Sequence, residues 1–127
     1  IGTVMGVTGR QTWSAAPRIA QYTVSTMHAD EQSGAAWAKE RDRLRDLLVT
    51  RRTALNEACS KLGVPLNPTM DGFFAWIESD DPAALAEACA DQDVYLVPLT
   101  GGVRIGLCAV PLSQIPRVAE ALANALA

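Results

Sequence analysis

The fold is decided by one stretch, Asp93-Val94-Tyr95-Leu96-Val97-Pro98-Leu99-Thr100-Gly101-Gly102-Val103-Arg104-Ile105-Gly106-Leu107-Cys108-Ala109. Two apolar runs, rich in β-branched residues, flank its central Thr-Gly-Gly segment. Such runs on either side of a short glycine-containing segment predict two strands joined by a tight turn.

The second of these strands carries one charged residue, Arg104. Strand alternation places it on the same face as Gly106 and away from Val103, Ile105 and Leu107. Burying an arginine is costly without an anionic partner, and the glycine leaves open space on the same face. The fork of guanidinium donors matches the two oxygens of a carboxylate. The pattern leaves two interpretations, a solvent-facing arginine on a half-exposed sheet or a carboxylate-binding arginine.

Working outward, the composition is that of an ordinary globular domain. A chain of 127 residues, 49% hydrophobic and 20% charged, predicts one domain with an ordinary core. A net charge of -3 and a pI near 5.0 argue against a nucleic-acid or anionic-membrane surface. Basic residues cluster between residues 41 and 52, where acidic residues interleave with them, which favours a solvated helix face. The arginines of this cluster are Arg41, Arg43, Arg45, Arg51 and Arg52.

Three cysteines without a Cys-x-x-Cys motif predict neither a disulfide framework nor a zinc site, and they favour a reducing cytoplasm. The sequence contains no recognisable signal peptide or membrane-spanning segment. It starts at Ile1 without an initiator methionine, which suggests a piece of a longer protein.

Helical patterns account for most of the remaining chain. Residues 33–62 carry one apolar stripe at steps of three and four residues, and Gly63 follows as a stop signal. Residues 18–27 predict a shorter helix. Asp81 and Pro82 predict the start of another helix that ends near residue 91, and Ser113 is expected to cap a helix over the last residues.

These elements predict an α+β fold. We expect a small mixed β-sheet from residues 73–77, 94–99 and 103–109, packed by the long helix and the C-terminal helix.

The order of segments at the end of the chain is Val-Tyr-Leu-Val, a glycine-containing turn, Val-Arg-Ile-Gly and a terminal amphipathic helix. This order resembles the C-terminal end of the class I/II (fold type I) pyridoxal-phosphate-dependent aminotransferases. The aspartate and aromatic amino-acid branch is the most similar. The matching arginine of that family binds the α-carboxylate of the substrate. The resemblance therefore implies that Arg104 binds substrate.

Two further segments share this resemblance. An aromatic-Ser-x-x-Pro segment lies at the family's active site, contributed by the neighbouring subunit, and an arginine three residues before it binds the distal carboxylate of a dicarboxylic substrate. The resemblance implies substrate contacts for Arg10 and Ser14, although Trp13 stands where the family usually has tyrosine. The family also has a Gly-x-Phe segment whose phenylalanine lines the substrate pocket, and Phe74 matches that phenylalanine.

The resemblance also implies how the chain corresponds to the domains of the family. Residues 1–17 correspond to a segment leading from a large domain missing here, and residues 18–127 correspond to the small domain. Lys39 and Lys61 are the only lysines, and neither lies in the cofactor-binding motif of the family. No catalytic, cofactor-binding or metal-binding residue is therefore expected in this chain, which should be inactive alone.

In the complete enzyme the resemblance implies pyridoxal 5'-phosphate as cofactor, amino-acid and 2-oxo-acid substrates, the large domain of the same polypeptide as a partner, and a homodimer. The expected activity is amino transfer from aromatic or dicarboxylic amino acids to a 2-oxo acid. Two alternatives remain, a free-standing regulatory domain that binds a small carboxylate, and a degenerate aminotransferase-like region of a transcription regulator.

Overall fold

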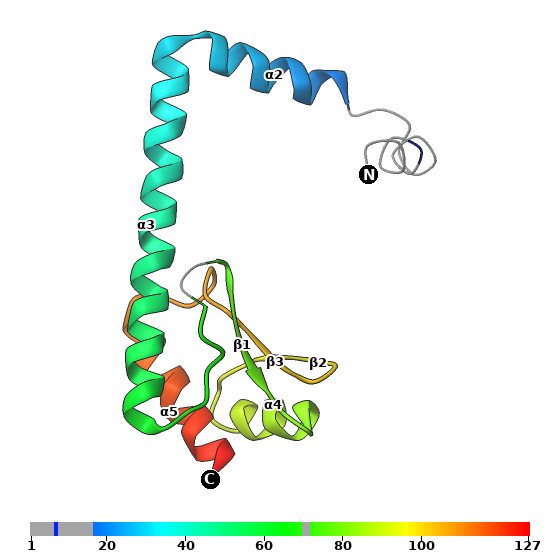
Figure 1. Cartoon of the computed structure of the whole chain (residues 1–127), viewed down its shortest axis with the longest axis vertical. Helices are drawn as coiled ribbons and strands as arrows, with labels where there is room; N and C mark the ends of the chain where they lie inside the picture. Colours follow the sequence, from blue (N-terminus) through cyan, green and yellow to red (C-terminus); the bar gives the residue numbers. More distant parts are fainter. Residues whose placement is uncertain (1–6, 8–16, 70–71) are drawn as a thin grey trace. The chain divides into compact units, whose positions relative to one another are not determined.

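The computed structural model describes Val7, residues 17–69 and residues 72–127. The chain divides into two compact units, Ile1–Asp42 and Arg43–Ala127. Helix α3 contributes residues to both (Figure 1). No helix in the described residues combines the length and the apolar character that a membrane span requires.

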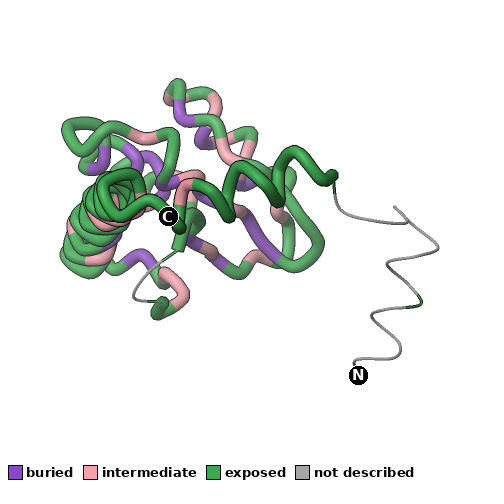
Figure 2. The backbone as a smooth tube through the Cα atoms, turned by 90° about the horizontal axis from the view of Figure 1, so that it is seen from above, coloured by how far each residue is buried: buried purple, intermediate pink, exposed green. Residues whose placement is uncertain are grey.

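The first unit contains helix α2, Arg18–Ala29, and the beginning of helix α3, Glu31–Leu62. Between the two helices, the carboxylate of Asp30 accepts a hydrogen bond from the backbone N–H of Ser33 at 2.7 Å. This bond satisfies one of the amides that a helix start leaves without a partner. Hydrogen bonding from the Ser33 side chain, and to a lesser extent from this backbone N–H, lowers the pKa of Asp30. None of the described residues of this unit is buried, as the green and pink tube in Figure 2 shows.

The second unit contains the remainder of α3 and a three-stranded sheet. Its strands are β1, Phe74–Glu78, β2, Val97–Leu99, and β3, Gly102–Gly106, in the order β1-β3-β2. Helix α4, Pro82–Ala90, connects β1 to β2. A short 3-10 helix, η1, Leu112–Gln114, leads into the last helix, α5, Ile115–Leu126.

One face of the sheet forms the core together with α3, α4 and α5. The strands contribute Ala75, Ile77, Val103 and Ile105, and Leu107 follows directly after β3. The helices contribute Leu55, Cys59, Leu85, Cys89, Ile115, Val118, Ala119, Ala121 and Leu122. The opposite face of the sheet carries Arg104, and the core that the helices form with the described strands lies on the other side.

The predicted α+β class and the elements that form it are confirmed, with one correction to the sheet. Both strand pairings are antiparallel, so the sheet is not mixed. The connection through α4 makes β1 and β2 run parallel to each other, but β3 lies between them and no parallel pair forms.

The other differences concern the ends of elements. β3 ends at Gly106 rather than 109, because the chain turns there and the N–H of Ala109 donates to the carbonyl of Gly106. β2 starts at Val97 rather than Val94, whose N–H bonds to the carbonyl of Cys89 at the end of α4. The expected Ser113 cap is wrong, since residues 112–114 form η1 and no side chain caps α5.

Candidate functional site

Arg104 occupies the middle of the central strand, on the open face of the sheet. It lies opposite Trp76 of β1 and Val97 of β2. Directly opposed residues of an antiparallel pair point to the same side, so these three side chains share one face. The predicted alternation is confirmed, since Val103 and Ile105 are buried on the other face.

The ring of Phe74 lies against the guanidinium of Arg104, with 4.4 Å between Cζ and the ring centroid. Phe74 is paired with Gly106, two residues beyond Arg104 on β3. A Cβ at Gly106 would meet no atom within 4 Å, so the phenyl ring has room to lean along the face. The stacked ring covers one face of the guanidinium and leaves its N–H edge free, because a cation–π contact uses the π face alone.

Trp76 points along the same face toward the start of β3. Its ring atoms Cζ2 and Cε2 would lie 2.6 and 2.8 Å from a Cβ at Gly102, and the carbonyl oxygen of Ile77 would lie 2.2 Å away. Only a glycine can therefore occupy position 102 while the indole and the neighbouring strand stay where they are.

The donors of Arg104 have no acceptor in the part of the chain that the structure describes. Arg104 makes no hydrogen bond or ion pair with another described residue, although it is half-buried. Arg117 of α5 differs, since its Nη2 donates to the carbonyl of Gln92 at 2.9 Å and to Asp93 at 3.1 Å. We call the Arg104 guanidinium and the Phe74 ring together the clamp.

A cavity of about 370 Å³ opens beside the clamp. Its wall includes Tyr95, Val97, Arg104, Gly106, Pro111 and Arg117, so it lies between the last two strands and the start of α5. The wall is mainly apolar and includes these two arginines. Such a cavity can receive an apolar or aromatic group attached to an anionic one.

The other predicted substrate contacts, the two lysines and the single histidine lie elsewhere. Arg10 and Ser14 lie outside the described residues. Lys39 and Lys61 are exposed on α3. His28 packs edge-on against Trp37, with 4.9 Å between ring centroids, and the described residues contain no group of side chains that could hold a metal ion.

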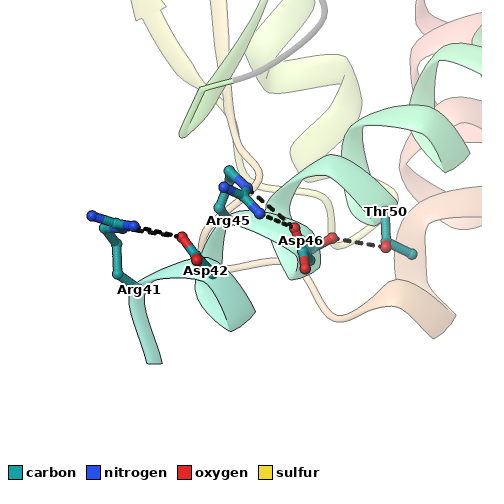
Figure 3. Close-up of polar contacts among 5 residues, drawn as sticks. All are labelled: Arg41, Asp42, Arg45, Asp46 and Thr50. Atoms are coloured by element: carbon teal, nitrogen blue, oxygen red, sulfur yellow. Dashed lines mark hydrogen bonds and ion pairs between the residues drawn. The ribbon is translucent and has the colours of Figure 1, made fainter. Parts of the chain in front are cut away.

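The basic cluster of α3 is a solvated face in its first part only. Arg41 pairs with Asp42 and Arg45 with Asp46, each at 2.9 Å and with largely exposed side chains (Figure 3). The prediction of a solvated face is wrong for Arg52, which is 1% exposed and donates from Nη2 to the carbonyl oxygen of Phe74.

Arg51 also turns toward the sheet. Its Nη1 donates to the carbonyls of Leu107 and Cys108, both at 2.9 Å. The sequence held a signal for the buried arginine, since position 52 falls on the apolar stripe between Leu48 and Leu55. Charge interleaving outweighed that periodicity in the sequence-based interpretation.

Titratable groups with shifted pKa values lie away from the clamp. Burial raises the pKa of the Cys59 thiol to about 11, and it also raises that of Cys89, because both thiolates would lose their hydration in the core. All three cysteines are free thiols, and Cys108 is exposed.

Residues 4–122 match the family model described as aminotransferase class I and II. The chain belongs to the class I and II aminotransferases. No curated protein matches the sequence.

Solved aminotransferase structures share the fold. An aminotransferase from Anaerococcus prevotii superposes with a TM-score of 0.82 at 22% identity, over 92% of this chain and 28% of its own. Thermus thermophilus aspartate aminotransferase tetra mutant 2, complexed with tryptophan, gives 0.67 at 21% identity, over 94% of this chain and 32% of its own. Tetra mutant 1 of that enzyme gives 0.67 at 21% identity, with 94% and 34% coverage. The chain thus spans about a third or less of each of these structures.

Proposed function

We propose that this chain is the C-terminal small domain of a pyridoxal-phosphate-dependent aminotransferase that acts on aromatic or dicarboxylic amino acids. Arg104 binds the α-carboxylate of the substrate in this proposal. The observation that carries it is the half-buried guanidinium of Arg104, which has no acceptor among the described residues and stacks on Phe74. A half-buried cation of this kind is stabilised by an incoming anion, and a carboxylate accepts two parallel bonds from it.

The cavity beside the clamp supports the same substrate class. A substrate whose carboxylate lies on Arg104 can direct its side chain along Val97 and Tyr95, both in the wall of the cavity. The apolar wall suits an aromatic side chain. The distal carboxylate of a dicarboxylic substrate is assigned to Arg10, and Ser14 is assigned to the active site of the neighbouring subunit, both from the family pattern.

The cofactor is assigned to residues outside this chain. Pyridoxal phosphate needs a lysine amine within a sheltered site, because the amine must be deprotonated to form the linkage. Lys39 and Lys61 are both exposed on a charged helix and do not fit that requirement. The residues of this chain would therefore bind and orient substrate, and the chain alone should have no transaminase activity.

The first unit supports the presence of more protein around this chain. It contains Ile19, 83% exposed, and Tyr22, 72% exposed, and none of its described residues is buried. Apolar side chains on a helix that buries nothing indicate a surface that packs against other protein. In this proposal the surface packs against the large domain of the same polypeptide, within a cytoplasmic homodimer.

The test is a kinetic comparison in the full-length protein. We define carboxylate discrimination as kcat/KM for an amino acid divided by kcat/KM for the amine that lacks its α-carboxylate. Arg104→Leu should lower this ratio, because a charge-assisted bidentate contact is lost. The loss should remove about 2–3 kcal/mol of transition-state stabilisation for the amino acid relative to the amine. Arg10→Ala should lower activity with dicarboxylic substrates and spare aromatic ones.

Two results would redirect the proposal. An Arg104→Leu enzyme with the discrimination of the wild type would remove the clamp assignment. A full-length protein that binds small carboxylates but transfers no amino group would favour a carboxylate-binding regulatory domain.

A further inference from the structure

Two consecutive arginines of α3 bind the backbone at one end of the sheet. Arg52 donates to the carbonyl of Phe74, the first residue of β1. Arg51 donates to the carbonyls of Leu107 and Cys108, the two residues that follow β3. Because Phe74 pairs with Gly106, both arginines act on the same end of the β1–β3 ladder.

The burial of Arg52 calls for a reason beyond packing. It is the one charged side chain that is buried among the described residues, at a position where the helix otherwise presents apolar residues to the core. A buried guanidinium carries a desolvation cost that an apolar side chain of similar size avoids. What the guanidinium adds is direction, since its donors bind a carbonyl at a fixed point and angle.

The carbonyl that Arg52 binds belongs to the residue that stacks on Arg104. The Phe74 ring lies 4.4 Å from the Arg104 guanidinium carbon, so the backbone position of Phe74 sets where the ring lies. Clamps of this kind lose efficiency when a group is displaced by about 1 Å. Fixing the Phe74 backbone therefore fixes the orientation of the N–H edge that Arg104 presents.

We propose that Arg52, assisted by Arg51, is a positioning residue for substrate carboxylate binding. It holds the Phe74 backbone so that the Phe74 ring keeps the Arg104 guanidinium aimed at the substrate. The inference rests on the proposed function of Arg104 and adds to it a pair of residues that touch no substrate.

The experiment measures carboxylate discrimination in the full-length enzyme for Arg52→Met, which keeps an unbranched apolar stem and removes the guanidinium with its donors. We expect discrimination to fall about tenfold, because the lost bond to a charged donor is transmitted to the clamp only in part. Activity on the amine should stay close to the wild-type value. Arg43→Met is the matched control, since Arg43 is exposed on the same helix, and it should change neither substrate's kcat/KM.

A double-mutant cycle separates positioning from general stability. In an Arg104→Leu background, Arg52→Met should have no further effect on discrimination, because the group that it positions is already gone. A purely structural role would lower kcat/KM for the acid and the amine alike, in both backgrounds. Arg52→Lys, which keeps the charge but has no planar fork, should give a value between wild type and Arg52→Met.

Folded Arg52→Met enzyme with wild-type discrimination would overturn the inference, as would an equal loss on acid and amine. If Arg52→Met does not fold, Arg52→Lys and Arg51→Met carry the test, and wild-type discrimination in both would overturn it. Failure of the proposed function has a different signature, since Arg104→Leu itself would then leave discrimination unchanged.

Discussion

Replacing Gly102 with alanine should disrupt the open face of the sheet more than any other glycine change in β3. A Cβ there would lie 2.2 Å from the carbonyl oxygen of Ile77 and 2.6 Å from Cζ2 of Trp76. Ordinary contacts between nonbonded heavy atoms need about 1 Å more than this. The indole can rotate away, but the carbonyl belongs to the backbone of the paired strand, so β1 must shift.

The cost should lie at the upper end of the range for overpacked sites, about 3 kcal/mol. Every 1.4 kcal/mol is a factor of ten in an equilibrium, so the β1 and β3 amides should exchange about a hundredfold faster with solvent. Amide hydrogen exchange of the full-length protein, followed by mass spectrometry on peptides that cover the two strands, measures this directly.

Two neighbouring glycines provide matched controls. Gly106→Ala meets nothing within 4 Å and should leave exchange close to wild type. Gly101→Ala also has open space, but its φ of +85 costs an L residue about 1–2 kcal/mol, which gives an intermediate effect. Exchange in Gly102→Ala within about threefold of the wild type would refute the steric argument, since a 3 kcal/mol loss demands far more.

Four further predictions concern the second unit. Asp81→Ala should destabilise α4 by about 1 kcal/mol, because Oδ1 of Asp81 accepts a 3.0 Å bond from an amide of its first turn, and thermal melting should detect the loss. A thiol reagent at neutral pH should modify the exposed Cys108 and leave buried Cys59 untouched until unfolding, as thiol counting by mass spectrometry will show. Burial raises the pKa of Cys59 from 9.0 to about 11. The contribution of this thiol to the free energy of unfolding is therefore complete below pH 9 and is lost as the pH rises from 9.0 to about 11. Stability measured by denaturant titration should decline over this pH range. Phe74→Leu removes the ring from the clamp. If Arg104 binds the substrate carboxylate as proposed, this change should lower kcat/KM for the acid about threefold to tenfold while sparing the amine, as expected for a partly exposed cation–π contact.

Sequence periodicity predicted the elements well because local patterns determine them. The alternation around Arg104 reflects one buried face and was confirmed. The apolar stripe of residues 33–62 correctly predicted a helix, but the helix buries only its last part, at Arg52, Leu55 and Cys59. Trp37, Leu44 and Leu62 of the same stripe are exposed. The predicted pair of strands around the glycine turn was confirmed as the β2–β3 pair. The antiparallel pairing of β1 with β3 was missed, because which strands become neighbours depends on how α4 carries the chain across and not on any single strand.

The site was predictable only in part. Strand alternation put Arg104 on the open face, but its stacking with Phe74 depends on the register between β1 and β3, which the sequence leaves undetermined. Arg52 was assigned to a solvated face because neighbouring charges are interleaved. Position 52 on the apolar stripe indicated its burial, but the backbone carbonyl that its guanidinium binds lies 22 residues away, and no local pattern encodes that partner.

The most direct test of the central claim is a crystal structure of the full-length protein with cofactor and a saturating aromatic or dicarboxylic 2-oxo acid. The proposal predicts both carboxylate oxygens next to the 2-oxo group within about 2.7–2.9 Å of two nitrogens of Arg104, with the Phe74 ring still stacked on the guanidinium. A bound acid whose carboxylate is held by other residues, with Arg104 directed into solvent, would contradict it.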